Sequence, residues 1–321
     1  MQRHEYTGPV ALRAMQSLAG HLFPDSGYRH IGDPTWAWCL ALDREDGNPT
    51  AVWTNGGGDR VRGGVRDGIR GGDAHAAGCP APGRTTVWAW LELPGSLQFQ
   101  VDPAHPELAD EVLAWAVGRA AAGRTAGGAL SVEVAETKPH LMAALERHGR
   151  TRRDGEPFML CPGRSLAEPP DAPALPAGYR IRAQHSPADV AGRAAAHRAA
   201  FGSKRVTTER HARMRETWPY RAEFDLVAVS PAGEVAAYCQ GWYDAANGVG
   251  AFEPVGTHPE HRRRGPARAV CLAVLRAFAA AGARRTPRPR RAPGKQGTGH
   301  PARRPHPPAA PPGRTRPDHY C

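Results

Sequence analysis

The sequence predicts an α/β (α+β) protein with two mixed-sheet modules in tandem, and three observations lead to this fold class. The chain has 321 residues, about two domains of roughly 150 residues, and 40% of them are apolar. Strand and helix patterns alternate in both halves. The tripeptide His-Pro-Glu follows a predicted strand twice, at 105–107 and 258–260, and an alanine-rich helical pattern follows each copy.

The second half shows the alternation most clearly. After a first strand, Ser186-Pro187-Ala188-Asp189 offers an N-cap, a proline for the first helical position and an acid that can complete a capping box. The turn residues Pro231-Ala232-Gly233 and Asn247-Gly248 then separate apolar runs. The expected elements are a strand at 179–183, helices to about 200 and 215, strands at 224–229, 235–242 and 250–255, and a helix from 267 that Gly282 ends.

The first half repeats this order in weaker form. The expected elements are strands at 87–93 and 97–101, a helix that ends at Gly123, a strand at 130–134, a helix at 139–148 and a strand at 158–161. Asp110 and Glu111 follow the first His-Pro-Glu, and no glycine accompanies them, so a bound anion would be repelled there. We therefore expect a non-catalytic first module that helps to wall a substrate cleft.

Composition divides the chain into four parts. Residues 1–164 form the first module, with a glycine-rich insert at 55–86, and residues 179–285 form the second. Four prolines in residues 165–178 indicate a semi-rigid linker. Residues 286–321 contain ten prolines and no Leu, Ile, Val, Met or Phe, so we expect a disordered tail. The insert and the tail begin abruptly. A shifted reading frame would also produce such abrupt changes in composition.

Charge and cysteine content exclude several classes of protein. The formal net charge is +11, but residues 286–321 carry +7 and residues 55–86 carry +2. Because the globular remainder is nearly neutral, nucleic-acid association through the basic tail ranks last among the functions considered. Six widely spaced cysteines without a C-x-x-C pair exclude a zinc module or a disulfide scaffold. The chain shows no apolar run of membrane length and no secretory signal, so we expect a cytoplasmic location.

The most informative segment lies where the 250–255 strand gives way to a helix. Arg262, Arg263 and Arg264 precede Gly265 at this junction. The first amide N–H groups of a helix have no intrahelical partner and the helix dipole attracts negative charge, so this backbone can hold a phosphate. Three arginines are more commonly a solvated charge run. Cations are unfavourable in a first helical turn, however, which favours a compensating anion here.

The sequence Arg262-Arg263-Arg264-Gly265-Pro266-Ala267, between a strand and an amphipathic helix, resembles the Q/R-x-x-G-x-G/A loop of the GNAT acetyltransferase superfamily. The resemblance covers roughly residues 179–285 and implies a tandem GNAT protein with a degenerate first module. It implies that Arg262, Arg263, Arg264, Gly265 and Ala267 bind the pyrophosphate of acetyl-CoA. It also implies that the backbone of Val255, Gly256 and Thr257 pairs with the pantetheine arm where two strands splay.

Acetyl transfer to an amine needs a base that leaves the nitrogen neutral. Glu253 is the candidate, because it lies two residues before Val255 and the period of a strand places both side chains on one face. A solvated strand residue, or a partner for an arginine, is an equally good interpretation of Glu253. Three aromatic residues either line the acceptor pocket or pack in the core: Tyr238, Trp242 and Tyr243. His258 and His261 lack a third ligand, so we expect no metal site.

The predicted function is therefore N-acetyl transfer from acetyl-CoA to an amine. In the superfamily another strand, a helix and a hairpin follow the cofactor helix, whereas here the proline- and arginine-rich tail follows it. We therefore expect the second module to lack its usual C-terminal strands, which would impair activity. A catalytically inactive CoA-binding or protein-interaction module is the alternative function. The pattern identifies neither the amine, nor the general acid, nor the oligomeric state.

Overall fold

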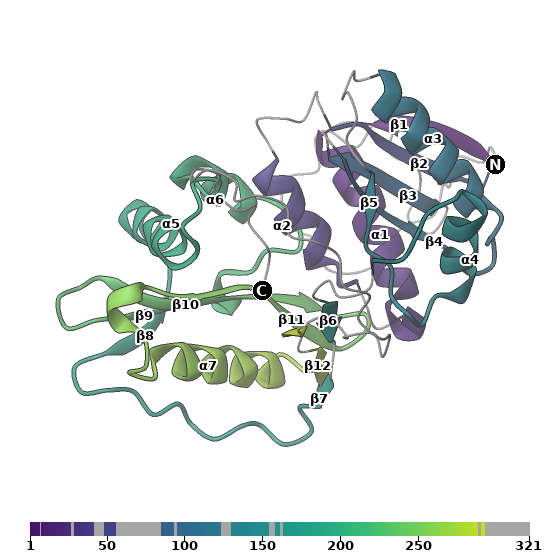
Figure 1. The fold of residues 1–321 in the computed structure, drawn as a ribbon. Helices are drawn as coiled ribbons and strands as arrows, with labels where there is room; N and C mark the ends of the chain where they lie inside the picture. The colour runs from purple at the N-terminus through teal and green to yellow at the C-terminus, as the bar shows by residue number, and fades with distance from the viewer. Residues whose placement is uncertain are drawn as a thin grey trace, which may run out of the picture.

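The computed structural model describes residues 1–6, 8–26, 29–41, 48–55, 85–92, 95–122, 130–153, 158–160, 163–287 and 290–292. Residues 56–84 of the glycine-rich insert and residues 288–289 and 293–321 of the tail lie outside the described residues, and so does the disorder expected for those parts of the tail. Two α+β modules lie against each other, each with a mixed sheet and flanking helices (Figure 1). No helix in the described ranges has both the length and the apolar character that crossing a bilayer requires.

The first module contains the predicted strand-helix pattern from residue 85 onward, and four earlier elements that the sequence patterns did not reveal. Its strands pair in the order β1-β2-β3-β4-β5, antiparallel except for the parallel β4–β5 pair. The elements are β1 (Gln2–Tyr6), α1 (Gly8–Ser26), α2 (Gly32–Leu40), β2 (Thr50–Thr54), β3 (Thr85–Glu92), β4 (Ser96–Val101), α3 (Leu108–Ala122), β5 (Ser131–Val132) and α4 (Pro139–Arg147).

The second module repeats this order of elements. Its strands pair in the order β8-β9-β10-β11-β12, again with only the last pair parallel. The elements are β8 (Arg180–Ala183), α5 (Pro187–Phe201), α6 (Thr208–Arg215), β9 (Asp225–Val229), β10 (Val235–Asp244), β11 (Val249–Thr257), α7 (Pro266–Ala280) and β12 (Arg285–Pro287). Two copies of one mixed-sheet fold therefore stand in tandem, as the repeated His-Pro-Glu indicated.

Two strand pairs correct the expectation that no strand follows residue 285. β12 lies between β11 and β7 (Gly163–Ser165), and β13 (Arg290–Ala292) pairs with β6 (Phe158–Leu160). The sequence does not reveal β12, because Arg-Thr-Pro has no apolar alternation and the neighbouring strands supply the pairing. β7 belongs to the second sheet, although the sequence analysis assigned residues 163 and 164 to the first module and Ser165 to the linker.

The proline-rich segment after β7 follows the outer side of the second module. Leu166 is buried in the core beneath α7, and its N–H donates to the Arg284 carbonyl oxygen at 2.8 Å. Arg276 of α7 donates from Nη1 to the Pro170 carbonyl oxygen at 2.8 Å. The segment 165–178 is therefore held against α7 at two points along its length (Figure 1).

Helices cover both faces of the second sheet. α7 packs on one face, where Phe278 lies so close to Gly241 and Gly250 that a Cβ atom at either glycine would come within 2.7 Å and 2.3 Å of its ring. α5 and α6 cover the other face, on which Val227 and Tyr238 pack with Ala196 of α5. The site described below lies on this second face, toward the first module.

The two modules share a hydrophobic core. Trp36 and Trp90 of the first module pack in one cluster with Val206, Met214 and Trp242 of the second. Hydrogen bonds flank this cluster, from Asn247 Nδ2 to the Gly20 carbonyl oxygen at 2.8 Å and from Gln16 Nε2 to the Trp218 carbonyl oxygen at 2.5 Å. Helices α1 and α2 of the first module therefore close one end of the second sheet.

Candidate active site

Glu253 lies in a β-bulge of β11. The register between β10 and β11 shifts so that Glu253 and Pro254 together lie opposite Gln240. Because of the extra residue, Val255 packs with Cys239 in the core beneath α7, whereas the neighbours of the Glu253 carboxyl lie on the opposite face. The expectation that Glu253 and Val255 share one face was wrong, since two-residue alternation fails at a bulge.

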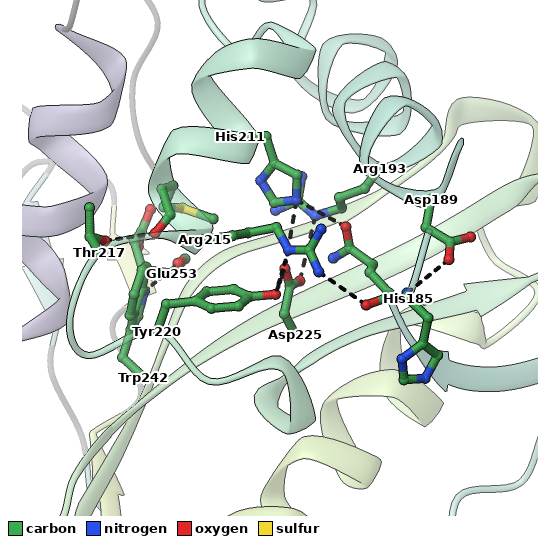
Figure 2. Close-up of polar contacts among 12 residues, drawn as sticks. His185, Asp189, Arg193, His211, Arg215, Thr217, Tyr220, Asp225, Trp242 and Glu253 are labelled. Atoms are coloured by element: carbon green, nitrogen blue, oxygen red, sulfur yellow. Dashed lines mark hydrogen bonds and ion pairs between the residues drawn. The ribbon is translucent and has the colours of Figure 1, made fainter. Parts of the chain in front are cut away.

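Glu253 is a half-buried residue, and the charged neighbour of its carboxyl belongs to the first module. Its electrostatic neighbours are Asp33 of α2 and Tyr238 of β10, and Trp242 Nε1 donates to the Glu253 carbonyl oxygen at 2.7 Å (Figure 2). Removal from bulk water raises the pKa of Glu253 well above its ordinary value, and the negative charge of Asp33 raises this pKa further. A carboxyl group with a raised pKa is suited to accept a proton from an ammonium group.

Tyr238 occupies the space above Gly256. A Cβ atom at Gly256 would stand 2.3 Å from the Tyr238 hydroxyl oxygen, so no larger residue fits at this point of β11. Burial lowers the pKa of His197 to about 3, and Nδ1 of the neutral ring makes a 2.7 Å hydrogen bond with the Tyr238 hydroxyl. The guanidinium carbon of Arg193 lies 3.4 Å from the centre of the Tyr238 ring.

A buried charged pair joins α5 to β9 behind Tyr238. Arg193 and Asp225 are both 0% exposed, and Arg193 Nε lies 4.0 Å from Asp225 Oδ1. Burial raises the pKa of Asp225 while the charge of Arg193 opposes that rise. Removing one member of such a pair leaves an uncompensated buried charge, so the pair fixes α5 on the sheet.

Helix α6 joins the same cluster through His211 and Arg215 (Figure 2). His211 Nε2 is 3.6 Å from Asp225 Oδ2 and 3.0 Å from Gln184 Oε1, and burial lowers the pKa of His211 well below its ordinary value. Arg215 Nε donates to the Tyr220 hydroxyl at 3.0 Å, and that hydroxyl donates to Asp225 Oδ2 at 3.3 Å. These contacts hold the helices that border the acceptor side of β10 and β11.

Helix α7 begins at Pro266, where the arginine-glycine segment predicted a helix start. Gly265 is its N-cap with φ 92°, and the Ala269 N–H makes an intrahelical bond to the Gly265 carbonyl oxygen at 3.1 Å. The first turn contains no acid and no side chain caps it. A Cβ atom at Gly265 would meet nothing within 4 Å, so the space beside Gly265 at the start of the helix is open.

The three arginines before Gly265 differ in their surroundings. Arg262 donates from Nη2 to the Ala200 carbonyl oxygen at 2.9 Å, near the C-terminus of α5. Arg263 has φ 61°, a conformation that favours glycine, and both Arg263 and Arg264 are exposed. Within the described ranges no carboxylate forms an ion pair with any of the three. Ala267, the remaining residue expected at the pyrophosphate, is half-buried in the first turn of α7.

One edge of β11 is open beside this helix start. β11 pairs with β12 only at Val249, so for the described residues no strand lies beside Val255, Gly256 and Thr257 on that edge. Their other edge is paired with β10. The edge at which the pantetheine arm is expected to pair is therefore unpaired among the described residues.

The remaining candidates have structural partners. Tyr238 and Trp242 are fully buried, and Tyr243 donates its hydroxyl hydrogen to the Ala281 carbonyl oxygen at 2.9 Å, so the core interpretation of these aromatic residues holds. His261 Nδ1 lies 2.8 Å from the Tyr179 hydroxyl. His258 begins the connection to α7, where its N–H donates to the Ala236 carbonyl oxygen at 2.9 Å.

Comparisons with known proteins identify the second module. The model of the acetyltransferase (GNAT) family matches residues 195–287. The second module therefore contains a GNAT domain. The chain resembles a GCN5-related N-acetyltransferase from Sphaerobacter thermophilus over 93% of its own length and 89% of the other chain, with a TM-score of 0.54 and 19% identity.

A second structure has the same tandem arrangement. A tandem GNAT protein from the clavulanic acid biosynthesis pathway matches 90% of each chain, with a TM-score of 0.51 and 15% identity. At these identities the similarity shows the fold, which is that of two GNAT-like modules in tandem. A search of curated protein sequences finds no match for this chain. The GNAT family and fold point to acyl transfer to an amine as the general activity.

Sequence reasoning missed several polar residues around Glu253. Arg193 and His197 lie on the buried face of α5, and Asp225 begins a fully paired strand. The sequence did contain a signal for these residues. A charged residue within an apolar helical stripe, or at the start of an apolar strand, indicates a buried polar contact. Asp33 gave no such signal, because α2 belongs to the other module and only tertiary packing brings it to β11.

Proposed function

We propose that this chain is an N-acetyltransferase that transfers an acetyl group from acetyl-CoA to an amine. The start of α7 carries the proposal: exposed arginines and a glycine N-cap surround helix amides that no carboxylate of the described chain occupies. Helix amides and guanidinium groups together form a seat for a diphosphate. Arg264, Gly265 and Ala267 would hold it, with Arg263 beside them, and Arg262 would divide its donors between the diphosphate and α5.

The open edge of β11 would hold the rest of the donor. The backbone of Val255, Gly256 and Thr257 would pair with the amides of the pantetheine arm as a neighbouring strand would. This arrangement would direct the thioester toward the bulge, because Glu253 immediately precedes these residues on β11.

The reaction follows from the placement of Glu253. Its carboxylate takes a proton from the acceptor's ammonium group and leaves a neutral nitrogen with a free lone pair. The nitrogen attacks the thioester carbonyl carbon, so that a C–N bond forms and the C–S bond breaks. A second proton leaves nitrogen and ends on the departing CoA thiolate. Glu253 then returns the first proton to solvent.

Calorimetry with acetyl-CoA tests the donor site. We expect Arg264→Glu to weaken binding at least ten-fold, because a charge-assisted hydrogen bond contributes about 1.5–3 kcal/mol and the variant also adds repulsion. Arg180→Glu, which makes the same charge change on exposed β8, is the matched control and should bind like the wild type. Equal affinity of both variants for acetyl-CoA would overturn the donor site.

Release of CoA thiol with a panel of amines tests the chemistry. Glu253→Gln should lower kcat by about 10² to 10⁴ with an unchanged dissociation constant for acetyl-CoA. If the wild type binds acetyl-CoA but acetylates no amine, the alternative of an inactive CoA-binding module is correct. A Glu253→Gln variant with normal kcat would assign the base to another group.

A further inference from the structure

His30 fixes the start of α2 against the second sheet. Its Nδ1 accepts the Gly32 N–H at 3.1 Å, so Nε2 carries the ring proton and donates to the Val249 carbonyl oxygen of β11 at 3.2 Å. Gly32 lies directly on Trp242, since a Cβ atom there would stand 2.2 Å from the indole. The first turn of α2 is therefore seated on β10 and β11, next to the bulge that contains Glu253.

Asp33 follows Gly32 and places a second carboxyl beside Glu253. Its Oδ2 accepts the His30 N–H at 2.8 Å, while Oδ1 has no hydrogen-bond partner in the described part of the chain. Neither Asp33 nor the Glu253 carboxyl forms an ion pair with another described residue. Burial raises the pKa of Asp33, and the neighbouring His30 and Arg29 oppose that rise. Arg29 also donates from Nη1 to Gln98 Oε1 at 3.0 Å. Two half-buried acids thus meet where the modules join.

Gln240 supplies an independent indication of a polar ligand. It is 0% exposed, and neither its Oε1 nor its Nε2 has a partner among the described groups. It extends from β10 between Tyr238 and Trp242, opposite the Glu253–Pro254 bulge. A buried carboxamide with both ends unpaired is costly, and a ligand that binds at the bulge would satisfy it.

We propose that the acceptor's ammonium group binds between Asp33 and Glu253, with Gln240 as a third contact, so that the first module completes the acceptor site. This inference rests on the proposed acetyl transfer and adds the substrate class. The site selects amines that carry no carboxylate next to the reacting nitrogen, because such a carboxylate would lie against two acids and be repelled. α-Amino acids are therefore expected to be poorer acceptors than the matching simple amines.

The first experiment compares matched acceptors that differ by one carboxylate: 2-phenylethylamine with phenylalanine, and 3-methylbutylamine with leucine. The wild type should prefer each amine by about ten-fold or more in kcat/KM. Asp33→Asn should reduce that preference and raise KM for the amine, since the amide oxygen can still accept the His30 N–H while the charge is lost. Glu92→Gln is the control, because Glu92 is also an acid between the modules and accepts from Arg205 Nη2 at 2.9 Å.

The pH dependence of kcat/KM is the second readout. The charged or titratable groups around Glu253 are Asp33 from α2 and Tyr238 from β10. His30 and Arg29 lie beside Asp33, and Arg193 and His197 of α5 lie behind Tyr238. Loss of the negative charge of Asp33 should move the midpoint of the acidic limb to lower pH, because it lowers the pKa of Glu253. A purely structural defect would not move this midpoint, and Glu92→Gln should leave it in place.

The outcomes separate the two proposals. If the wild type transfers acetyl groups but Asp33→Asn changes neither the selectivity nor the pH midpoint, this inference is overturned. The proposed function then still stands. A wild-type preference for the amino acids would do the same. Absence of CoA release with every amine would overturn the proposed function and this inference with it.

Discussion

The three consecutive arginines differ in their contacts and backbone conformation, although the sequence alone does not distinguish them. Arg262 is extended, with φ −64°, and its guanidinium donates to the last turn of α5, where the helix dipole favours a cation. Arg263 adopts φ 61°, which costs a non-glycine residue free energy. Strain of this kind persists where the surrounding structure or a ligand requires it. At the residue scale, the loop is therefore shaped for binding more than for stability.

A pair of glycine substitutions tests this difference. Arg263→Gly should raise the free energy of unfolding by about 0.5–1 kcal/mol, because it relieves the left-handed backbone, and it should weaken acetyl-CoA binding. Arg262→Gly should instead lower the free energy of unfolding, because its backbone is unstrained and the bond to Ala200 is lost. Urea unfolding and calorimetry measure the two effects. Equal loss of stability in both variants would contradict a strained Arg263.

At the scale of elements, α5 shows how a local signal positions the site. Ser186 Oγ accepts the Asp189 N–H at 3.2 Å, and Asp189 Oδ2 accepts the Ser186 N–H at 3.0 Å, so the predicted capping box is present. Arg182 of β8 also donates to Asp189 Oδ1 at 2.5 Å. The cap sets where α5 begins and therefore where Arg193 and His197 meet the sheet.

Asp189→Asn tests the cap through its pH dependence. The Arg182 guanidinium holds the pKa of Asp189 well below its ordinary 3.8, so its stabilisation is present above that value and is lost as pH falls toward the lowered pKa. At pH 7 the variant should lose about 1 kcal/mol of stability, and the difference from wild type should shrink below about pH 4. Asp171→Asn, an exposed position in the 165–178 linker, should have no effect in the same urea titrations. A difference that does not change with pH would contradict the ionic contribution.

At the scale of the whole molecule, the two modules form one body. The shared cluster around Trp36, Met214 and Trp242 contains the residues that support the bulge, and α2 supplies Asp33 to it. The first module therefore contributes to the site although its own helix start at Asp110 and Glu111 is unsuited to a diphosphate. Asp110 instead accepts from Arg147 at 2.8 Å.

Gly32→Ala tests whether the modules depend on each other. The added methyl group would lie 2.2 Å from the Trp242 ring, and such overpacking should cost about 1–3 kcal/mol. Thermal melts followed by tryptophan fluorescence and by circular dichroism should shift together in one transition. Gly118→Ala, in α3 with nothing within 4 Å of the new atom, should be neutral or slightly stabilising. Two separate transitions would show that the modules unfold independently.

Local patterns determined most elements of the second module. Ser186 and Thr207 cap α5 and α6 as expected, and α7 begins next to Gly265, because these signals depend only on neighbouring residues. The bulge at Glu253 was not predictable, since an extra residue in one strand is defined by its pairing with Gln240 of another. β12 was missed for the same reason, because its three residues form a strand only between β11 and β7.

The sequence by itself determined the repeated α+β order and the cationic helix start, because capping, turn chemistry and charge act over a few residues. Tertiary structure alone decided which face Glu253 takes and that Asp33, 220 residues earlier, lies beside it. Strand register and module packing depend on backbone pairing and buried surface between distant segments. No short window of sequence contains both partners of such a contact.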